Sequence, residues 1–338
     1  MPFRLLDAAT PAESGRAEQF LALVAEPLEA TDRLFRDCLA SDVPFIDQCG
    51  EYIFAGGGKR MRPALLLLCA QLLGRDGEEE VTYAAVVELI HTATLIHDDV
   101  IDHAALRRGR RTINELWGNN QTVLLGDWLY TKAMKMALAH GSVEVIDRLC
   151  EATLRMTEGE LLTQQRLGAR DLSVDEYFRI IDRKTAQLFA AACSVPARHR
   201  PARPEAIEPL ERYGRALGVC FQLADDLLDY TATAATVGKP VLSDLKEGKL
   251  TLPLLLALPR LRAEERAKVE MVIEDRSFTR VEASEILELV QREGTIGEVE
   301  LQAQALADEA RKALATFPDS ETRRALEFAP DFVLHRRA

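Results

Sequence analysis

The sequence predicts an all-α architecture, a large helical bundle around a central cavity. Apolar residues recur at helical spacing through most of the chain, and no segment shows the alternating pattern of a half-buried strand. Two aspartate triplets with identical spacing lie within such apolar helical stretches. Of 338 residues, 47% are hydrophobic, which is ample for a large core. We expect one domain over residues 1–338.

The predicted helices follow one another with short breaks. Glycines at 56–58 and prolines between 196 and 209 are typical of such breaks, and they resemble connections between helices more than linkers between domains. The helical segments are 17–40, 63–73, 81–104, 123–139, 144–168, 175–194, 205–230 and 252–260, followed by an amphipathic region through residue 317.

Composition excludes several classes of function. The net charge of -12 argues against general nucleic-acid binding, which needs a basic surface. Apolar runs such as 64–68 and 252–258 are too short for a transmembrane segment, and the amino terminus lacks a signal-peptide stretch, so we expect a cytoplasmic protein. The six cysteines form no Cys-x-x-Cys pair, which favours buried thiols over disulfides or zinc ligands.

The two aspartate triplets share the pattern Asp-Asp-x-x-Asp. Their members are Asp98, Asp99 and Asp102 in the first triplet, and Asp225, Asp226 and Asp229 in the second. On a helix, the first and last carboxylates of each triplet face the same way, and the middle one points about 100° away. Two such helices facing each other would gather carboxylates at a cost in free energy unless cations neutralise them.

Magnesium suits such a site, because it prefers oxygen ligands and is usually held by one or two carboxylates together with substrate phosphates. The triplets therefore predict a magnesium site that holds a diphosphate. For either triplet alone, an acidic and solvated helix end explains the sequence equally well. The pairing of two triplets with nearby basic segments favours the metal site.

A basic segment at 56–63 forms a second candidate site. It reads Gly56-Gly57-Gly58-Lys59-Arg60-Met61-Arg62-Pro63, so free backbone donors and cationic side chains meet at the start of a helix and favour a phosphate. A Walker A loop is excluded, because its spacing is not met and no strand precedes the glycines. The plain alternative is a helix cap with solvated basic residues.

Further cations accompany the triplets. Arg107 and Arg108 follow the first triplet closely, Lys184 and Thr185 lie in an apolar helix, and Lys239 and Lys249 follow the second triplet. Each lysine alone is typical of a solvated surface. As a set they supply the positive charge that a departing diphosphate requires.

Taken in order, these segments resemble the trans-polyprenyl diphosphate synthase family, over about residues 50–260. The matching segments are Gly57-Gly58-Lys59-Arg60-Met61-Arg62-Pro63, Asp98-Asp99-Val100-Ile101-Asp102, Arg107-Arg108-Gly109, Glu158-Gly159-Glu160, Lys184-Thr185, Phe221-Gln222-Leu223-Ala224-Asp225-Asp226-Leu227-Leu228-Asp229, Gly238-Lys239 and Asp244-Leu245-Lys246-Glu247-Gly248-Lys249. The resemblance implies the isoprenoid synthase fold and a homodimer. It also implies head-to-tail condensation of isopentenyl diphosphate with an allylic diphosphate, farnesyl or geranylgeranyl, using Mg2+, expected as three ions with bound diphosphate.

The resemblance also implies roles for individual residues. Isopentenyl diphosphate would be held by Lys59, Arg62, His91 and Arg108. The allylic diphosphate would contact Arg107, Lys184, Gln222, Lys239 and Lys249. Metal would be ligated by Asp98, Asp102 and Asp225 and supported by Asp99, Asp226 and Asp229. Oxygen atoms of Thr185 and Gln222 would face the developing carbocation.

Small residues before the first triplet suggest a long product. Members of the family that stop at short products often carry an aromatic ring four or five residues before the first aspartate, where this chain has Ala93 and Thr94. We expect a polyprenyl diphosphate of the octaprenyl class, the kind used for quinone side chains. A geranylgeranyl diphosphate synthase is the alternative if Ile90 or Val86 closes the cavity floor.

Two other functions compete with this interpretation. A terpene cyclase or head-to-head synthase would share the fold, but a cyclase's usual second motif mixes Asn or Asp, Ser or Thr, and Glu. A non-catalytic subunit of a heteromeric prenyl synthase would be expected to lose aspartates, and this chain retains all six.

Overall fold

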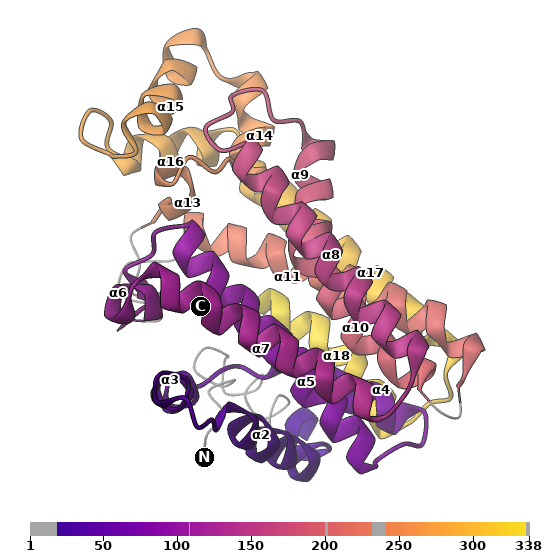
Figure 1. Ribbon diagram of the computed structural model, residues 1–338. Helices are drawn as coiled ribbons and strands as arrows, with labels where there is room; N and C mark the ends of the chain where they lie inside the picture. The colour runs from indigo at the N-terminus through magenta and orange to yellow at the C-terminus, as the bar shows by residue number, and fades with distance from the viewer. Residues whose placement is uncertain (1–18, 108, 200–201, 232–240, 336–338) are drawn as a thin grey trace.

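A computed structural model describes residues 19–107, 109–199, 202–231 and 241–335 of the chain (Figure 1). Its elements are α2 (Ala25–Leu39), α3 (Pro44–Ala55), α4 (Met61–Leu72), α5 (Glu78–Ile101), β1 (Leu106–Arg107), β2 (Arg110–Arg111), α6 (Ile113–Trp117), α7 (Asn119–Ala139), α8 (Val143–Gln165), α9 (Val174–Ile181), η2 (Asp182–Ala186), α10 (Gln187–Arg198), α11 (Pro204–Thr231), α13 (Ser243–Lys246), α14 (Leu252–Ala257), η3 (Leu258–Arg260), α15 (Ala263–Asp275), α16 (Ala283–Arg292), α17 (Thr295–Ala313), η4 (Leu314–Thr316) and α18 (Glu321–His335). The all-α prediction is confirmed.

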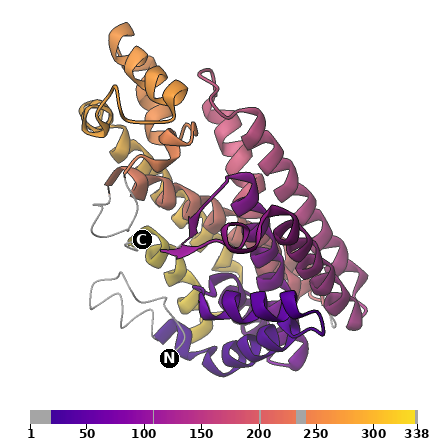
Figure 2. The same ribbon diagram turned by 60° about the vertical axis from the view of Figure 1, so that its left-hand side comes forward.

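The long helices form the body of the molecule. Helix α10 packs on α11, α11 packs on α17, and α5 packs on α7. Helices α15 and α16 lie at one end of this body, and α2 and α3 lie at the opposite end, as both views show (Figures 1 and 2). Helices α5 and α11 carry the two aspartate triplets, with Asp102 at the C-cap of α5, and η2 carries Lys184 and Thr185, so the body of the bundle positions the site.

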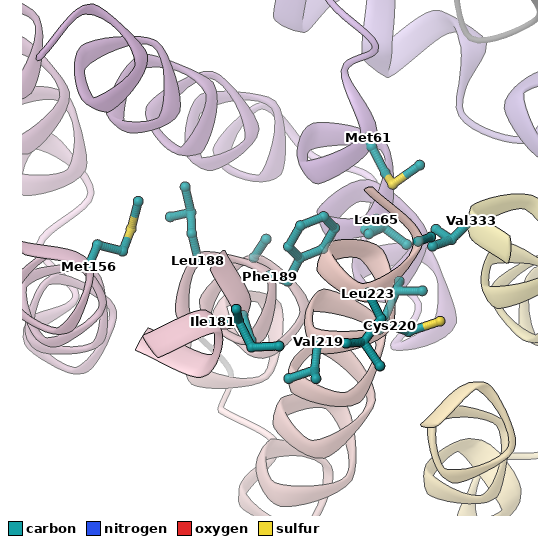
Figure 3. Close-up of a cluster of buried hydrophobic side chains, with 14 of the residues drawn as sticks. Met61, Leu65, Met156, Ile181, Leu188, Phe189, Val219, Cys220, Leu223 and Val333 are labelled. Atoms are coloured by element: carbon teal, nitrogen blue, oxygen red, sulfur yellow. The ribbon is translucent and has the colours of Figure 1, made fainter. Parts of the chain in front are cut away.

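The buried core reaches directly beneath the predicted site. Figure 3 shows buried side chains contributed by α4, α8, α9, α10, α11 and α18, with Phe189 among them. Phe189 is fully buried, and its ring centroid lies 5.2 Å from that of Phe221. The Arg62 guanidinium lies 4.3 Å from the same Phe189 centroid, so a predicted anion-binding cation rests on the core.

Two glycines allow α11 to approach its neighbours closely. A Cβ on Gly214 would lie 2.5 Å from the Phe189 carbonyl oxygen, and one on Gly218 would lie 2.6 Å from Cα of Ala186. Backbone atoms cannot move aside as the end of a side chain can. Gly214 therefore sets the spacing between α11 and α10, and Gly218 sets the spacing between α11 and the turn that carries Lys184 and Thr185.

Two departures from the sequence prediction involve segments that carry predicted site residues. A single helix was expected over 175–194, but a π-helical turn, η2, separates α9 from α10. Such turns insert one residue into a helix without changing its apolar pattern much, so periodicity does not reveal them. No strand was expected, yet β1 and β2 pair as a short antiparallel hairpin, too short to show alternation.

Two expectations from the composition concern the cysteines and membrane-spanning helices. All six cysteines are free, and only Cys150 is exposed, in agreement with the prediction of thiols over disulfides. Within the described ranges, no helix combines the length and apolar character that crossing a membrane requires.

Replacing Gly218 with Ala tests the close approach of α11. The added methyl group would press on the Ala186 backbone, so we expect a loss of about 1–3 kcal/mol in the free energy of unfolding. Urea denaturation of the purified protein measures it. The control is Gly297→Ala in the first turn of α17, where an added Cβ meets no atom within 4 Å, and a helical alanine should stabilise by about 0.5–1 kcal/mol. Equal effects of the two substitutions would contradict the packing argument.

Candidate functional site

The first triplet lies at the carboxyl end of α5, where the helix dipole disfavours negative charge. Two cations compensate for this placement. Arg107 on β1 donates through Nε to Asp99 Oδ1 at 2.7 Å, and Lys249 donates through Nζ to Asp102 Oδ1 at 3.3 Å. Asp99 is buried, and its pairing ties the short hairpin to α5. The three carboxylates thus have different partners.

The surroundings of Asp98 disfavour the charged form of its carboxyl group. Burial raises the pKa of Asp98 to about 6, Lys184 opposes this rise, and the nearby carboxylates Glu160 and Asp102 add to it. The Lys184 ammonium is in turn paired with Glu160 on α8. A divalent cation beside Asp98 would therefore relieve an excess of negative charge.

The second triplet on α11 divides into three distinct environments. Asp225 is exposed, and Asp226 is buried. Asp229 accepts hydrogen bonds from the Ser243 backbone N at 2.9 Å and from the Asp244 backbone N at 3.1 Å. Since α13 begins at Ser243, Asp229 satisfies the first N–H groups of that short helix.

Asp226 belongs to a chain of buried and partly buried hydrogen bonds. Tyr177 donates its hydroxyl to Asp226 Oδ2, and Gln222 donates Nε2 to Asp226 Oδ1 at 2.8 Å. Thr185 donates its hydroxyl to Gln222 Oε1 at 2.7 Å. Burial raises the pKa of Asp226 well above its usual range, and the neighbouring Asp244 acts in the same direction. The predicted pair Thr185 and Gln222 is thereby brought together.

The π-helical turn η2 presents Lys184 and Thr185. Gly159 on α8 lies against this turn, because a Cβ there would be 2.6 Å from the backbone N of Lys184. Only a residue without a side chain lets α8 approach the turn so closely. Gly159 belongs to the Glu158-Gly159-Glu160 segment, which is one of the segments that resemble the family. The packing against η2 explains why a glycine is needed there.

In the basic segment 56–63, one cationic side chain turns into the core and two others line a pocket. Arg60 has a φ of 47° and turns into the core, where it donates to Asp32 Oδ1 and to Glu88 Oε1, both at 2.6 Å. Arg62 lies on the other side of the loop, with Nη1 3.1 Å from His91 Nε2. Arg60 therefore holds the loop, and Lys59 and Arg62 line a pocket.

Two pockets flank the first triplet. The α4–α5 pocket is lined by Lys59, Arg62, His91, Asp99, Arg107 and Phe221, together with the glycines at 56–58. The α9–α11 pocket is lined by Lys184, Thr185, Gln222, Asp226, Asp244 and Lys249. Asp99 faces the first pocket, while the partners of Asp98 and Asp102 line the second. Two separate pockets thus adjoin residues that the sequence analysis assigned to two anion sites, one beside Lys59 and Arg62 and the other beside Lys184 and Lys249.

The donor set suits magnesium that arrives with a phosphate ligand. Among the described residues, no three His, Cys, Asp or Glu side chains are gathered into a ready-made metal cage. The Asp102 carboxylate instead forms an ion pair with Lys249. The donors present are carboxylate oxygens, which magnesium prefers, and a bound diphosphate supplies oxygen ligands that the protein does not. The residues therefore fit Mg2+ bound jointly with substrate.

Other predicted residues lie apart from the pockets. Ala93 is buried in α5, and Thr94 donates its hydroxyl to the His91 carbonyl oxygen at 2.9 Å; neither lines the two pockets. By helical spacing, Thr94 lies one turn below Asp98. Arg108 and Lys239 lie outside the described residues. Tyr177, which the sequence analysis did not single out, looks like an ordinary position of an amphipathic helix.

Comparisons with known proteins agree on one family. The protein-family model described as Polyprenyl synthetase matches residues 43–290. Octaprenyl diphosphate synthase of Escherichia coli (strain K12) is 40% identical over 309 residues, covering 91% of this chain and 95% of that protein.

Solved structures give the same result. The chain is similar to a polyprenyl synthase from Caulobacter crescentus CB15 complexed with calcium and isoprenyl diphosphate, with a TM-score of 0.90, 39% identity, and coverage of 95% of this chain and 98% of that one. A decaprenyl diphosphate synthase from Rhodobacter capsulatus is similar with a TM-score of 0.89, 37% identity, and coverage of 95% and 99%.

Replacing Arg60 with Met tests whether this arginine serves the fold of the loop. The change leaves Asp32 and Glu88 buried without their cation, so the free energy of unfolding should fall by about 3–5 kcal/mol. Urea denaturation measures the loss. The control Arg36→Met breaks an exposed pair with Glu51, 3.1 Å between Nη2 and Oε1, and should change stability little. An Arg60→Met protein as stable as the control would refute this role.

Proposed function

This chain belongs to the polyprenyl synthetase family, and we propose that it condenses isopentenyl diphosphate head-to-tail with an allylic diphosphate to make a long-chain all-trans polyprenyl diphosphate. The observation that carries the proposal is the pair of pockets on either side of the Asp98–Asp102 helix end, each with its own cations. Two diphosphates need two such sites. We also propose that the chain acts as one domain, since one hydrophobic cluster extends from Val24 to Val333.

The α9–α11 pocket would take the allylic diphosphate. Lys184 and Lys249 line it. From the resemblance we assign Lys239 to the same substrate, and also Arg107, although Arg107 lines the neighbouring α4–α5 pocket. Asp98, Asp102 and Asp225 would hold Mg2+, with three ions proposed; when bound, the metal neutralises charge on the departing diphosphate. Lys249 donates to Asp102 and Glu247, and its ammonium group has a third donor that could reach a phosphate oxygen.

The α4–α5 pocket would take isopentenyl diphosphate. Lys59 and Arg62 would bind its phosphates, together with His91 and Arg108. Arg62 is restrained by the Phe189 ring below it and by His91 beside it, so its guanidinium is oriented before substrate arrives. This pre-orientation reduces the entropy lost on binding.

The reaction would then take place between the two pockets. The allylic carbon–oxygen bond breaks, and the oxygens of Gln222 and Thr185 stabilise the developing carbocation by their partial negative charge. The isopentenyl double bond attacks this carbon, and proton loss restores an allylic group. No side chain stands out as a base, and the resemblance to the family implies that the departing diphosphate takes the proton.

We propose a product of the octaprenyl class. The similarity to an octaprenyl diphosphate synthase at 40% identity supports this length, as do the small side chains Ala93 and Thr94 before the first triplet. A geranylgeranyl product is less favoured by these observations. All six aspartates are present, which favours an active enzyme over a non-catalytic subunit of a heteromer.

We further propose a homodimer joined through α7 and α8. These helices expose large apolar side chains that a monomer would leave in water: Leu124, Leu138, Leu154 and Leu161 are each more than half exposed. The cytoplasmic location expected from the sequence stays a prediction.

Incubating the purified chain alone with labelled isopentenyl diphosphate, farnesyl diphosphate and Mg2+ tests the function. We expect elongated, extractable product of the octaprenyl class, and none when EDTA removes the metal. Replacing Asp98 with Asn should lower turnover by about a hundredfold or more, because a metal ligand is lost. Failure of the chain alone to elongate the primer would favour the subunit interpretation.

Replacing Ala93 with Phe tests the proposed control of product length. A ring in the path of the growing tail should stop elongation earlier, so the main product should become shorter, as measured by chromatography. The control Ala305→Phe adds the same ring at an exposed position of α17, away from the proposed dimer helices, and should leave the product unchanged. An unchanged product from Ala93→Phe would show that Ala93 does not border the tail.

A further inference from the structure

We propose that Tyr177 is a positioning residue that acts through Asp226 to fix the orientation of the Gln222 carboxamide. The inference rests on the proposed function, in which the Gln222 and Thr185 oxygens face the developing carbocation. Tyr177, Asp226, Gln222 and Thr185 form one continuous series of hydrogen bonds from α9 through α11 to η2, here termed the α9–α11 chain.

Asp226 determines which end of the Gln222 side chain faces which neighbour. A carboxamide has a donor end and an acceptor end of nearly equal size, so shape alone does not orient it. The Asp226 carboxyl oxygens receive Gln222 Nε2 on one side and the Tyr177 hydroxyl on the other. Gln222 Oε1 is therefore directed toward Thr185, which donates to it at 2.7 Å.

Both ends of the α9–α11 chain are held by packing. Thr185 lies in η2, whose backbone is pressed by Gly159 on one side and by Gly218 on the other. Tyr177 is only 4% exposed, and its ring packs edge-on against Phe178 with centroids 5.5 Å apart. Between these fixed points, Gln222 is the flexible member, with three side-chain torsions that the hydrogen bonds must restrain.

The Tyr177 hydroxyl also prevents Asp226 from turning elsewhere. Asp226 is buried, so each of its oxygens needs a donor, and Tyr177 supplies the one for Oδ2. Without that hydroxyl, the carboxyl group would rotate to share its remaining donor, Gln222 Nε2, between both oxygens. The Gln222 oxygen would then lose its defined direction toward Thr185 and the pocket.

A second buried tyrosine provides a matched control. Tyr230 is also 4% exposed, lies on the same helix as Asp226, and its hydroxyl is 2.8 Å from Thr251 Oγ1. That hydroxyl contacts no member of the α9–α11 chain in the described hydrogen bonds. Removing either hydroxyl should cost comparable stability, but only the Tyr177 hydroxyl should affect turnover strongly.

The test compares Tyr177→Phe with Tyr230→Phe in the elongation assay. We expect Tyr177→Phe to lower kcat by about ten- to hundredfold, because a misoriented group near the reacting atoms loses its effect steeply with displacement. KM for isopentenyl diphosphate should stay within about twofold, since the α4–α5 pocket is untouched. Tyr230→Phe should leave kcat within about threefold, with a similar shift in Tm.

A double-mutant cycle with Gln222→Met separates positioning from general damage. If Tyr177 acts through Gln222, Tyr177→Phe should lower kcat by less than about twofold once Gln222 is replaced, because coupled residues are not additive. Equal effects of Tyr177→Phe with and without Gln222 would overturn the inference, and so would a kcat loss no larger than that of Tyr230→Phe. If the unaltered protein itself does not elongate the primer, the proposed function fails instead, and this inference falls with it.

Discussion

The compensation of negative charge at the carboxyl end of α5 governs the layout of the site. Carboxylates at the end of α5 oppose the helix dipole, and each draws a partner from a different part of the chain: Arg107 for Asp99, Lys249 for Asp102, and Lys184 near Asp98. These cations come from a hairpin, a loop and a π-helical turn. Their convergence ties together segments that are otherwise far apart in sequence.

The same cations line the pockets, which links stability to function. Lys249 is held by Asp102 and Glu247, and its pKa is raised by these carboxylates despite the opposing effect of burial. A cation that neutralises a carboxylate in the resting protein is also in place to bind a phosphate when metal takes over the carboxylate. The charge of the site is thus partly balanced both in the resting protein and with metal and phosphate bound, which avoids a large electrostatic penalty in either state.

Close backbone approach is the second requirement of the site. Gly159 and Gly218 bring α8 and α11 against η2, so the hydroxyl of Thr185 reaches Gln222 directly. The basic loop before α4 is held by ion pairs and not by close backbone packing, because Asp32 and Glu88 anchor Arg60 in the core. One cation of the segment is used to hold the loop, and this leaves Lys59 and Arg62 at the pocket.

The sequence by itself determined the helical class, the position of both triplets and the existence of two basic regions, because helical periodicity and local spacing are properties of neighbouring residues. Residue type and spacing do not reveal that Arg60 turns into the core while Arg62 lines a pocket, or that Asp225 is exposed while Asp226 is buried; the roles given to Arg62 and Asp225 came from the family resemblance. The sequence pattern also did not single out Tyr177 or predict the π-helical turn. Only the tertiary structure decided these points, because burial and partner choice depend on which helices pack together, and residues as distant as Tyr177 and Asp226 meet only in the folded bundle.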